Sequence, residues 1–139
     1  MAGRRRRPAV GGTVVLDADG VSKAADADRR VQAFLTSARS RDARVVVSAA
    51  TLAEVLRGGP RDARAHRVLG RVTKLPVSPE LGQRAGELLG STGLAEATVD
   101  ALVAATALDQ LGPVLVLTSD PDDLRLLTAS RRDISVQPV

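Results

Sequence analysis

The feature that most constrains the fold is a series of short apolar runs, rich in β-branched residues and separated by segments with helical spacing. Thr13–Leu16, Val45–Val47 and Val114–Leu117 carry no charge, so each is predicted to be a strand buried on both faces. Ile134–Val136 is predicted to be a further strand. Strands without a polar face that alternate with helices indicate an α/β fold, with a mostly parallel central sheet flanked by helices.

The segments between these strands are predicted to be helical. The spacing of apolar residues favours one helix over residues 24–41 and another that begins at Thr51 and ends before Gly58-Gly59-Pro60. Four more helices are predicted: residues 61–73, residues 80–90, a helix from Thr98 to near Gly112, and a last helix beginning at Asp120-Pro121.

The chain length of 139 residues suits one domain, predicted at residues 13–139, preceded by a basic flexible tail over residues 1–12. Arg4, Arg5, Arg6 and Arg7 account for the whole formal charge of +4. The absence of cysteine excludes disulfides, zinc–thiolate sites and thiol nucleophiles, and fits a cytoplasmic location. We expect neither a signal peptide nor contact with a membrane, because no apolar run is long enough. Phe34 is the one aromatic residue, which excludes recognition of nucleic acid by stacking platforms.

Acidic residues occupy the positions where parallel sheets carry their active sites, beyond the carboxyl ends of strands. Asp17 directly follows the first predicted strand, and Asp120 follows the third across Thr118-Ser119. Glu54 and Asp100 are each predicted to lie in the first turn of a helix. We expect these four carboxylates to meet at one edge of the sheet.

Each of these acids also has a structural interpretation. Thr51 and Glu54 match a capping box, Asp100 complements a helix dipole, Asp120 is a good N-cap residue, and Asp17 can organise a turn. Together, however, four carboxylates in one cleft repel one another and require a counter-cation. Carboxylate oxygens are ligands that Mg²⁺ or Mn²⁺ prefers, so the sequence favours a divalent-metal site.

Four motifs in order resemble the PIN-domain ribonuclease toxins of bacterial toxin–antitoxin pairs, the VapC type. They are Val15-Leu16-Asp17-Ala18-Asp19, Ala53-Glu54-Val55-Leu56-Arg57-Gly58, Val99-Asp100-Ala101-Leu102-Val103-Ala104-Ala105-Thr106-Ala107 and Thr118-Ser119-Asp120. Many members of the family have Ser or Thr two positions after the first Asp, where this chain has Asp19.

The resemblance implies a PIN-like domain and a metal-dependent endoribonuclease in which Asp17, Glu54, Asp100 and Asp120 are the catalytic and metal-binding residues, with Mg²⁺ or Mn²⁺ as cofactor. The metal activates water for attack on RNA, so no histidine base is required. Secondary candidates at the rim of the site are Thr118, Asp19, Asp122 and Asp123. The resemblance further implies a type II toxin that forms a homodimer and is silenced by a cognate antitoxin.

Arginines around the predicted helix over residues 61–73 are candidates for RNA binding. Arg61, Arg64, Arg67 and Arg71 fall on one side of this helix, and Arg57 lies shortly before it. Such a face can hold phosphates. It can equally be a solvated face, or one that pairs with the acids of a protein partner.

Two other functions are consistent with parts of the sequence. Asp17-Ala18-Asp19-Gly20-Val21 fits the opening motif of haloacid-dehalogenase-type phosphatases, with Asp17 as nucleophile and Asp19 as acid/base. The other parts would come from Ser48, Lys74 and the cluster of Asp120, Asp122 and Asp123. That interpretation gives Glu54 and Asp100 no role. The second alternative is a non-catalytic PIN-like domain that binds RNA or a protein partner.

Overall fold

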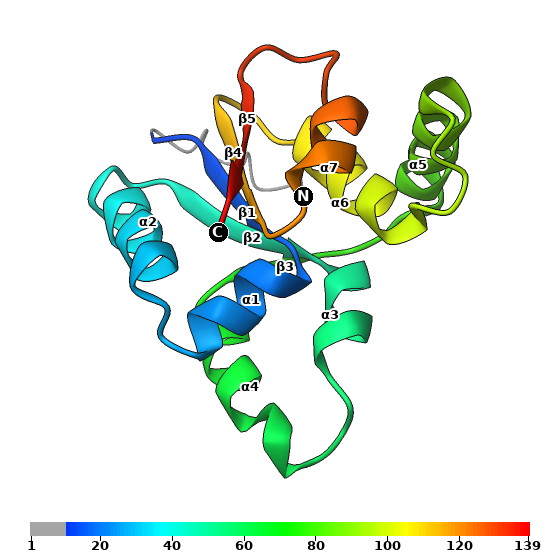
Figure 1. Ribbon diagram of the computed structural model, residues 1–139. Helices are drawn as coiled ribbons and strands as arrows, with labels where there is room; N and C mark the ends of the chain where they lie inside the picture. The colour runs from blue at the N-terminus through cyan, green and yellow to red at the C-terminus, as the bar shows by residue number, and fades with distance from the viewer. Residues whose placement is uncertain (1–10) are drawn as a thin grey trace, which may run out of the picture.

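The fold is a five-stranded parallel sheet with strand order β3-β2-β1-β4-β5, and the computed structural model describes residues 11–139 (Figure 1). The strands are β1 (Thr13–Leu16), β2 (Arg44–Ser48), β3 (Thr73–Leu75), β4 (Val114–Thr118) and β5 (Ile134–Pro138). The helices are α1 (Ala18–Ala25), α2 (Arg29–Ser40), α3 (Ala49–Val55), η1 (Pro60–Asp62), α4 (Ala63–Leu69), α5 (Pro79–Thr92), α6 (Thr98–Leu108) and α7 (Pro121–Leu127). The predicted α/β class is confirmed. The first ten residues of the predicted basic tail lie outside the described residues.

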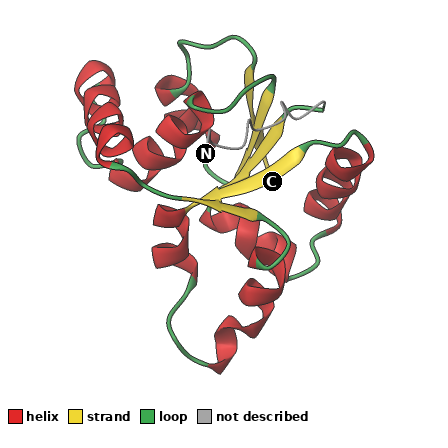
Figure 2. Cartoon of the chain, turned by 180° about the vertical axis from the view of Figure 1, so that it is seen from behind, coloured by secondary structure: helices red, strands yellow, loops and turns green. Residues whose placement is uncertain are grey.

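Helices cover both faces of the sheet, because the central strands are apolar on both sides (Figure 2). Val14 and Leu16 of β1 pack into a core with α1, α2 and α4, and the intervening Val15 packs into a second core with α5, α6 and α7. Val15 and Leu16 are fully buried. The central position of β1, between β2 and β4, places the residue that follows it at the middle of the sheet's carboxyl edge.

The prediction of a single helix over residues 24–41 is wrong, because two helices, α1 and α2, occupy residues 18–40. Asp17 caps the N-terminus of α1, so helix begins immediately after β1, before the predicted start at residue 24. Ala27, with φ of 56°, interrupts the helical path, and the Asp28 carboxylate then accepts a hydrogen bond from the Val31 N–H at 3.0 Å and starts α2.

The predicted start of α3 at Thr51 is also wrong. Ser48, the last residue of β2, caps the helix by accepting a hydrogen bond from the Ala50 N–H at 3.1 Å. Thr51 is therefore buried inside α3, and Glu54 lies near the C-terminal end of that helix rather than in its first turn. The capping box predicted for Thr51 and Glu54 does not form.

The helix predicted over residues 61–73 is shorter, because η1 and α4 end at Leu69 and residues 73–75 form β3. Arg71 lies in the turn between α4 and β3. Similarly, α6 ends at Leu108 instead of near Gly112. Within residues 11–139, no helix combines the length and the apolar content needed to cross a membrane.

Candidate active site

Asp17 lies where β1 passes directly into α1, and its side chain is held from two sides. Its Oδ1 accepts a hydrogen bond from the Gly20 N–H at 2.8 Å. A Cβ at Gly20 would lie 3.0 Å from the Leu117 carbonyl oxygen, so glycine allows the first turn of α1 to pack against the end of β4. This close packing fixes the Asp17 carboxylate, only 8% exposed, at the edge shared by β1 and β4.

Thr118 links Asp17 to Asp120 across this edge. Its Oγ1 accepts a hydrogen bond from the Asp120 N–H at 3.1 Å. Hydrogen bonds from Thr118 and Gly20 lower the pKa of Asp17, but burial has the larger effect and raises it. Asp120 occupies the N-cap position of α7, as predicted, yet its side chain makes no capping hydrogen bond, so the exposed carboxylate is available to a ligand.

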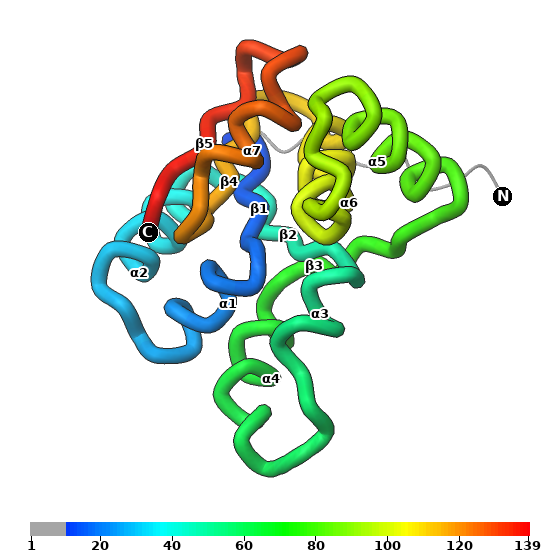
Figure 3. Tube along the Cα trace, turned by 45° about the vertical axis from the view of Figure 1, so that its right-hand side comes forward, coloured from blue at the N-terminus to red at the C-terminus, as the bar shows by residue number. Residues whose placement is uncertain are grey.

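Asp100 lies in the first turn of α6. Its pKa is raised to about 6, chiefly by burial and further by the charges of Asp123, Asp17, Asp120 and Glu54. These interactions place carboxylates from β1, α3, α6 and the β4–α7 junction in one electrostatic neighbourhood. In the trace, α6 lies near α3, and the two helices are in contact (Figure 3).

Glu54 reaches the same neighbourhood from the exposed side of α3. Burial raises its pKa, the charges of Asp17 and Asp19 raise it further, and Arg57 lowers it. The Arg57 guanidinium donates hydrogen bonds to the carbonyls of Ala53 and Leu56, both at 2.9 Å. The other three acids of the sequence-predicted set, Asp17, Glu54 and Asp120, thus all lie near enough to Asp100 to raise its pKa.

The secondary candidates divide into two groups. Asp123 lines an open hollow of about 570 Å³ together with Asp100 and the α5–α6 loop, residues 93–97. Asp19 lies near enough to Asp17 and Glu54 to raise the pKa of both. Asp122, in contrast, pairs with Arg125 at 3.8 Å on the exposed side of α7. Asp123 and Asp19 therefore belong to the cluster, whereas Asp122 is engaged elsewhere.

The charge balance of the cluster fits a divalent cation. Within residues 11–139, no ion pair reaches Asp17, Glu54, Asp100 or Asp120, and these acids raise one another's pKa. The oxygen-only donor set suits Mg²⁺ or Mn²⁺. In the part of the chain that the structure describes, no three acidic side chains yet stand in a metal-binding arrangement. The exposed side chains of Glu54 and Asp120 would have to turn inward on binding.

The residues proposed for a phosphatase have other roles in the fold. Ser48 is fully buried and caps α3, and the Lys74 Nζ donates a hydrogen bond to the Leu69 carbonyl at 2.7 Å. Both side chains therefore have a structural role. His66 is exposed on α4.

The comparison with protein families agrees with this arrangement, since the profile of the PIN domain matches residues 14–127. The chain belongs to the PIN domain family. The match includes all four acids of the cluster. A comparison with curated protein sequences finds no significant relative.

Several solved structures share the fold. VapBC2 from Rickettsia felis, bound to a DNA fragment from its promoter, superposes with a TM-score of 0.67 at 16% identity over 91% of this chain and 98% of that one. A toxin–antitoxin complex from Klebsiella pneumoniae gives 0.65 at 18% identity, covering 88% and 95% of the two chains. FitAB bound to the IR36 DNA fragment gives 0.61 at 22% identity, covering 90% and 94%.

The predicted RNA-binding arginines do not form one continuous helical face. Arg57 and Arg61 lie around the α3–η1 connection, whereas Arg64 and Arg71 line a pocket with Arg67. Arg39 of α2 lines the same pocket and was absent from the predicted set. Its position 25 residues before Arg64 gives no local sequence signal, because the two meet only through the packing of separate helices.

Proposed function

We propose that this PIN domain protein is a metal-dependent endoribonuclease and the toxin of a type II toxin–antitoxin pair of the VapC type. The observation that carries the proposal is the convergence of Asp17, Glu54, Asp100 and Asp120, from four separate parts of the fold, with no ion pair to any of them within residues 11–139. Membership of the PIN domain family supports it.

In this proposal, Asp17, Asp100, Asp120 and Glu54 hold Mg²⁺ or Mn²⁺, which activates a water and neutralises charge on the phosphate when bound. The protein's part is to present oxygens in a fixed orientation. Gly20 and Thr118 hold the Asp17 carboxylate in place and favour its charged form. Asp100 must lose its proton to act as a ligand, and its raised pKa of about 6 keeps that step close to neutral pH.

The proposed partners are RNA as substrate, an antitoxin as inhibitor and a second copy of the chain in a homodimer, all in the cytoplasm. The names of the structural neighbours support an antitoxin, because they are toxin–antitoxin complexes. A group of neighbouring carboxylates attracts a cation, and arginine, with its planar fork, is the side chain best suited to replace a metal there. We therefore propose that the antitoxin inserts an arginine among Asp17, Glu54, Asp100 and Asp120.

The test is cleavage of a panel of structured RNAs by the purified protein. We expect Mg²⁺- or Mn²⁺-dependent endonucleolytic cleavage that EDTA and the Asp100→Asn substitution both abolish. Cleavage that persists in Asp100→Asn would point to a contaminating nuclease. RNA binding without cleavage in either metal would instead support the non-catalytic domain.

A separate measurement distinguishes the nuclease from the haloacid-dehalogenase-type phosphatase. Hydrolysis of a small phosphate monoester, with trapping of Asp17 as an aspartyl–beryllofluoride complex, would support that alternative. We expect neither.

A further inference from the structure

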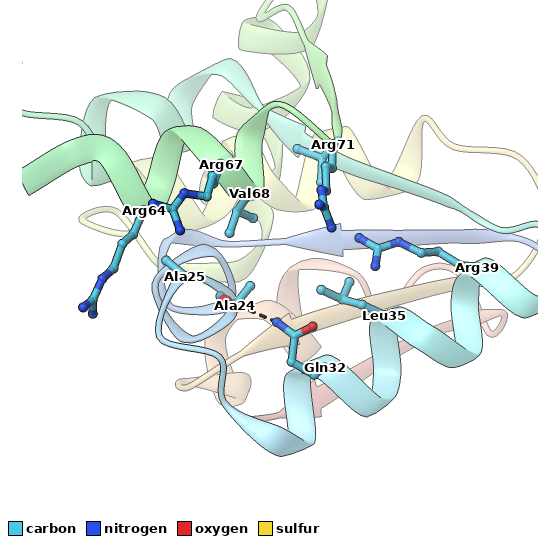
Figure 4. A pocket seen from close by; sticks show the side chains of 10 residues that line it. Ala24, Ala25, Gln32, Leu35, Arg39, Arg64, Arg67, Val68 and Arg71 are labelled. Carbon is cyan, nitrogen blue, oxygen red and sulfur yellow. Dashed lines mark hydrogen bonds between the residues drawn. The ribbon is translucent and has the colours of Figure 1, made fainter.

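A second charged site lies at the opposite end of α1 from the carboxylates. It is a pocket of about 240 Å³ between α1, α2 and α4 (Figure 4). Leu35 and Val68 give the pocket an apolar lining, with Ala24 and Ala25 from the end of α1. Four arginines also line it: Arg39, Arg64, Arg67 and Arg71.

The arginines of this pocket have little to balance their charge. No acidic residue is among the residues that line it. Within residues 11–139, Arg39, Arg67 and Arg71 form no ion pair, and Arg64 reaches Asp26 at 3.7 Å through side chains that are both largely exposed. Figure 4 shows Arg39 and Arg71 pointing toward one another across the pocket, from two different elements. Like charges that converge in this way are stabilised by an anion between them.

We propose that this pocket binds phosphate groups of the RNA strand whose scissile bond lies at the carboxylates, an inference that rests on the proposed nuclease function. Guanidinium groups pair bidentately with phosphate oxygens, and they keep their charge at any physiological pH. The pocket is lined by no aromatic side chain, so it binds the backbone and not the bases. Its role is to position the strand without reading its sequence.

The distribution of charge favours RNA over an acidic protein segment. The carboxylate cluster repels a polyanion, and residues 8–139 contain as many acidic as basic residues, so the domain offers no general attraction. Affinity for RNA must then come from a local cationic surface. The eight residues of α1 join the two sites, and span about 12 Å at the rise of an α-helix. A single strand covers that distance in a few nucleotides and can occupy both sites together.

The test measures binding separately from cleavage. Full-length protein carrying Asp100→Asn, in EDTA, is titrated with a short fluorescent single-stranded RNA at several salt concentrations. The pocket variant adds Arg39→Gln and Arg71→Gln. The matched control adds Arg30→Gln and Arg132→Gln, which remove the same charge from exposed positions outside the pocket. Melting curves of all proteins establish that each is folded.

We expect the pocket variant to raise the Kd for RNA roughly tenfold, with a smaller effect in the control. The slope of log Kd against log salt should fall by about 1.4, because each phosphate contact to a single strand contributes about 0.7. Arg39→Lys with Arg71→Lys retains the charge, so it should keep the salt slope while losing part of the affinity.

Other outcomes overturn the inference. Equal RNA binding by the pocket variant and the control would show that the arginines do not contact RNA, as would an Asp100→Asn protein that binds no RNA. If the pocket variant keeps its RNA affinity but loses binding to an alternating Glu–Leu peptide, the pocket is a protein-docking site. If the parent protein fails to cleave RNA yet binds it through Arg39 and Arg71, the nuclease proposal fails and the phosphate pocket stands.

Discussion

Asp123 of α7 raises the pKa of Asp100 on α6 more than any other charge in the protein. The two side chains line the same hollow beside the α5–α6 loop. Sequence alone placed Asp123 at the rim of the site, yet the packing of α7 against α6 makes it the main electrostatic neighbour of Asp100. In the metal-free protein, the repulsion between Asp100 and Asp123 therefore opposes the packing of α6 against α7, which the apolar core holds together.

This repulsion makes the stability of the metal-free protein depend on pH. Because the pKa of Asp100 is about 6 in the folded state and 3.8 without the fold, folded protein binds more protons between these values, and stability falls as pH rises from about 4 to 6. Asp100→Asn should increase the free energy of unfolding by about 1–2 kcal/mol at pH 7.5, after allowance for solvent screening. Urea unfolding in EDTA at pH 7.5 and at pH 3.5 measures this, and the gain should vanish at the lower pH.

Asp123→Asn is the matched test of the electrostatic cause. It removes one neighbour of Asp100 and leaves Asp100 itself, so it should lower the pKa of Asp100 and give a smaller gain in stability. An unchanged titration of Asp100 in this variant, followed by NMR, would show that burial alone raises the pKa.

A bound divalent metal should neutralise the repulsion between Asp100 and the neighbouring carboxylates. Mg²⁺ or Mn²⁺ at ten times its Kd should stabilise the parent protein by about 1.4 kcal/mol, and Asp100→Asn should lose most of this gain. Because metal and proton compete for the Asp100 carboxylate, cleavage at subsaturating metal should increase with pH through about 6 as Asp100 loses its proton. Thermal melting with and without metal, together with a pH–rate profile, measures both effects. A rate independent of pH between 5 and 7 would contradict the assignment of Asp100 as a ligand.

Asp17 has a structural and a proposed chemical role, and two substitutions separate them. Asparagine keeps an oxygen that can accept the Gly20 N–H, so Asp17→Asn should retain the start of α1. Asp17→Ala should lose about 1 kcal/mol of stability with this cap. Both should abolish RNA cleavage. Full activity in either variant would show that Asp17 is a capping residue only.

Thr118 should act on the site through its neighbours. Thr118→Val preserves shape but removes the acceptor for the Asp120 N–H and the hydrogen bond that lowers the pKa of Asp17. We expect the pKa of Asp17 to rise, metal affinity to fall and stability to decrease by about 1 kcal/mol. Thr118→Ser should restore all three. NMR titration of Asp17 distinguishes this from a purely structural loss, which would leave its pKa unchanged.

Inhibition by the proposed antitoxin should depend on metal concentration. Excess Mg²⁺ should weaken inhibition, because the cation and an inserted arginine compete for the same carboxylate oxygens. Inhibition assays at increasing Mg²⁺, with an antitoxin peptide and its arginine-to-glutamine variant, measure the competition. Equal inhibition by both peptides would mean that the antitoxin acts by covering a groove and not by replacing a charge.

The parts of the fold that sequence predicts are those set by local burial. β1, β2, β4 and β5 lie where apolar runs place them, and the runs of β1, β2 and β4 are too apolar to face water. β3 was missed because Leu75 is its single buried residue, so the edge strand leaves no apolar run. α1 was missed because Asp17 and Gly20 are typical of turns, and their role as helix cap and close packing point depends on β4.

The same distinction applies to the site. Asp17 and Asp120 were predictable because strand ends in a parallel sheet share one edge. The large effect of Asp123 on the pKa of Asp100 was not predictable, and neither was the approach of Arg39 to Arg71. Each results from contact between elements that are far apart in the sequence. The spacing of residues along one element carries no information about such contacts.

The pairing of β1 with β4 also sets the order of events during synthesis. Thr13 pairs with Val114, about 100 residues later, so β1 emerges from the ribosome roughly 5 to 20 s before its partner at ordinary translation rates. Asp17 and Asp120 cannot meet during that interval. Under the proposed function, a nascent chain of this protein cannot cleave RNA until the end of β4 and the start of α7 are free to fold onto β1.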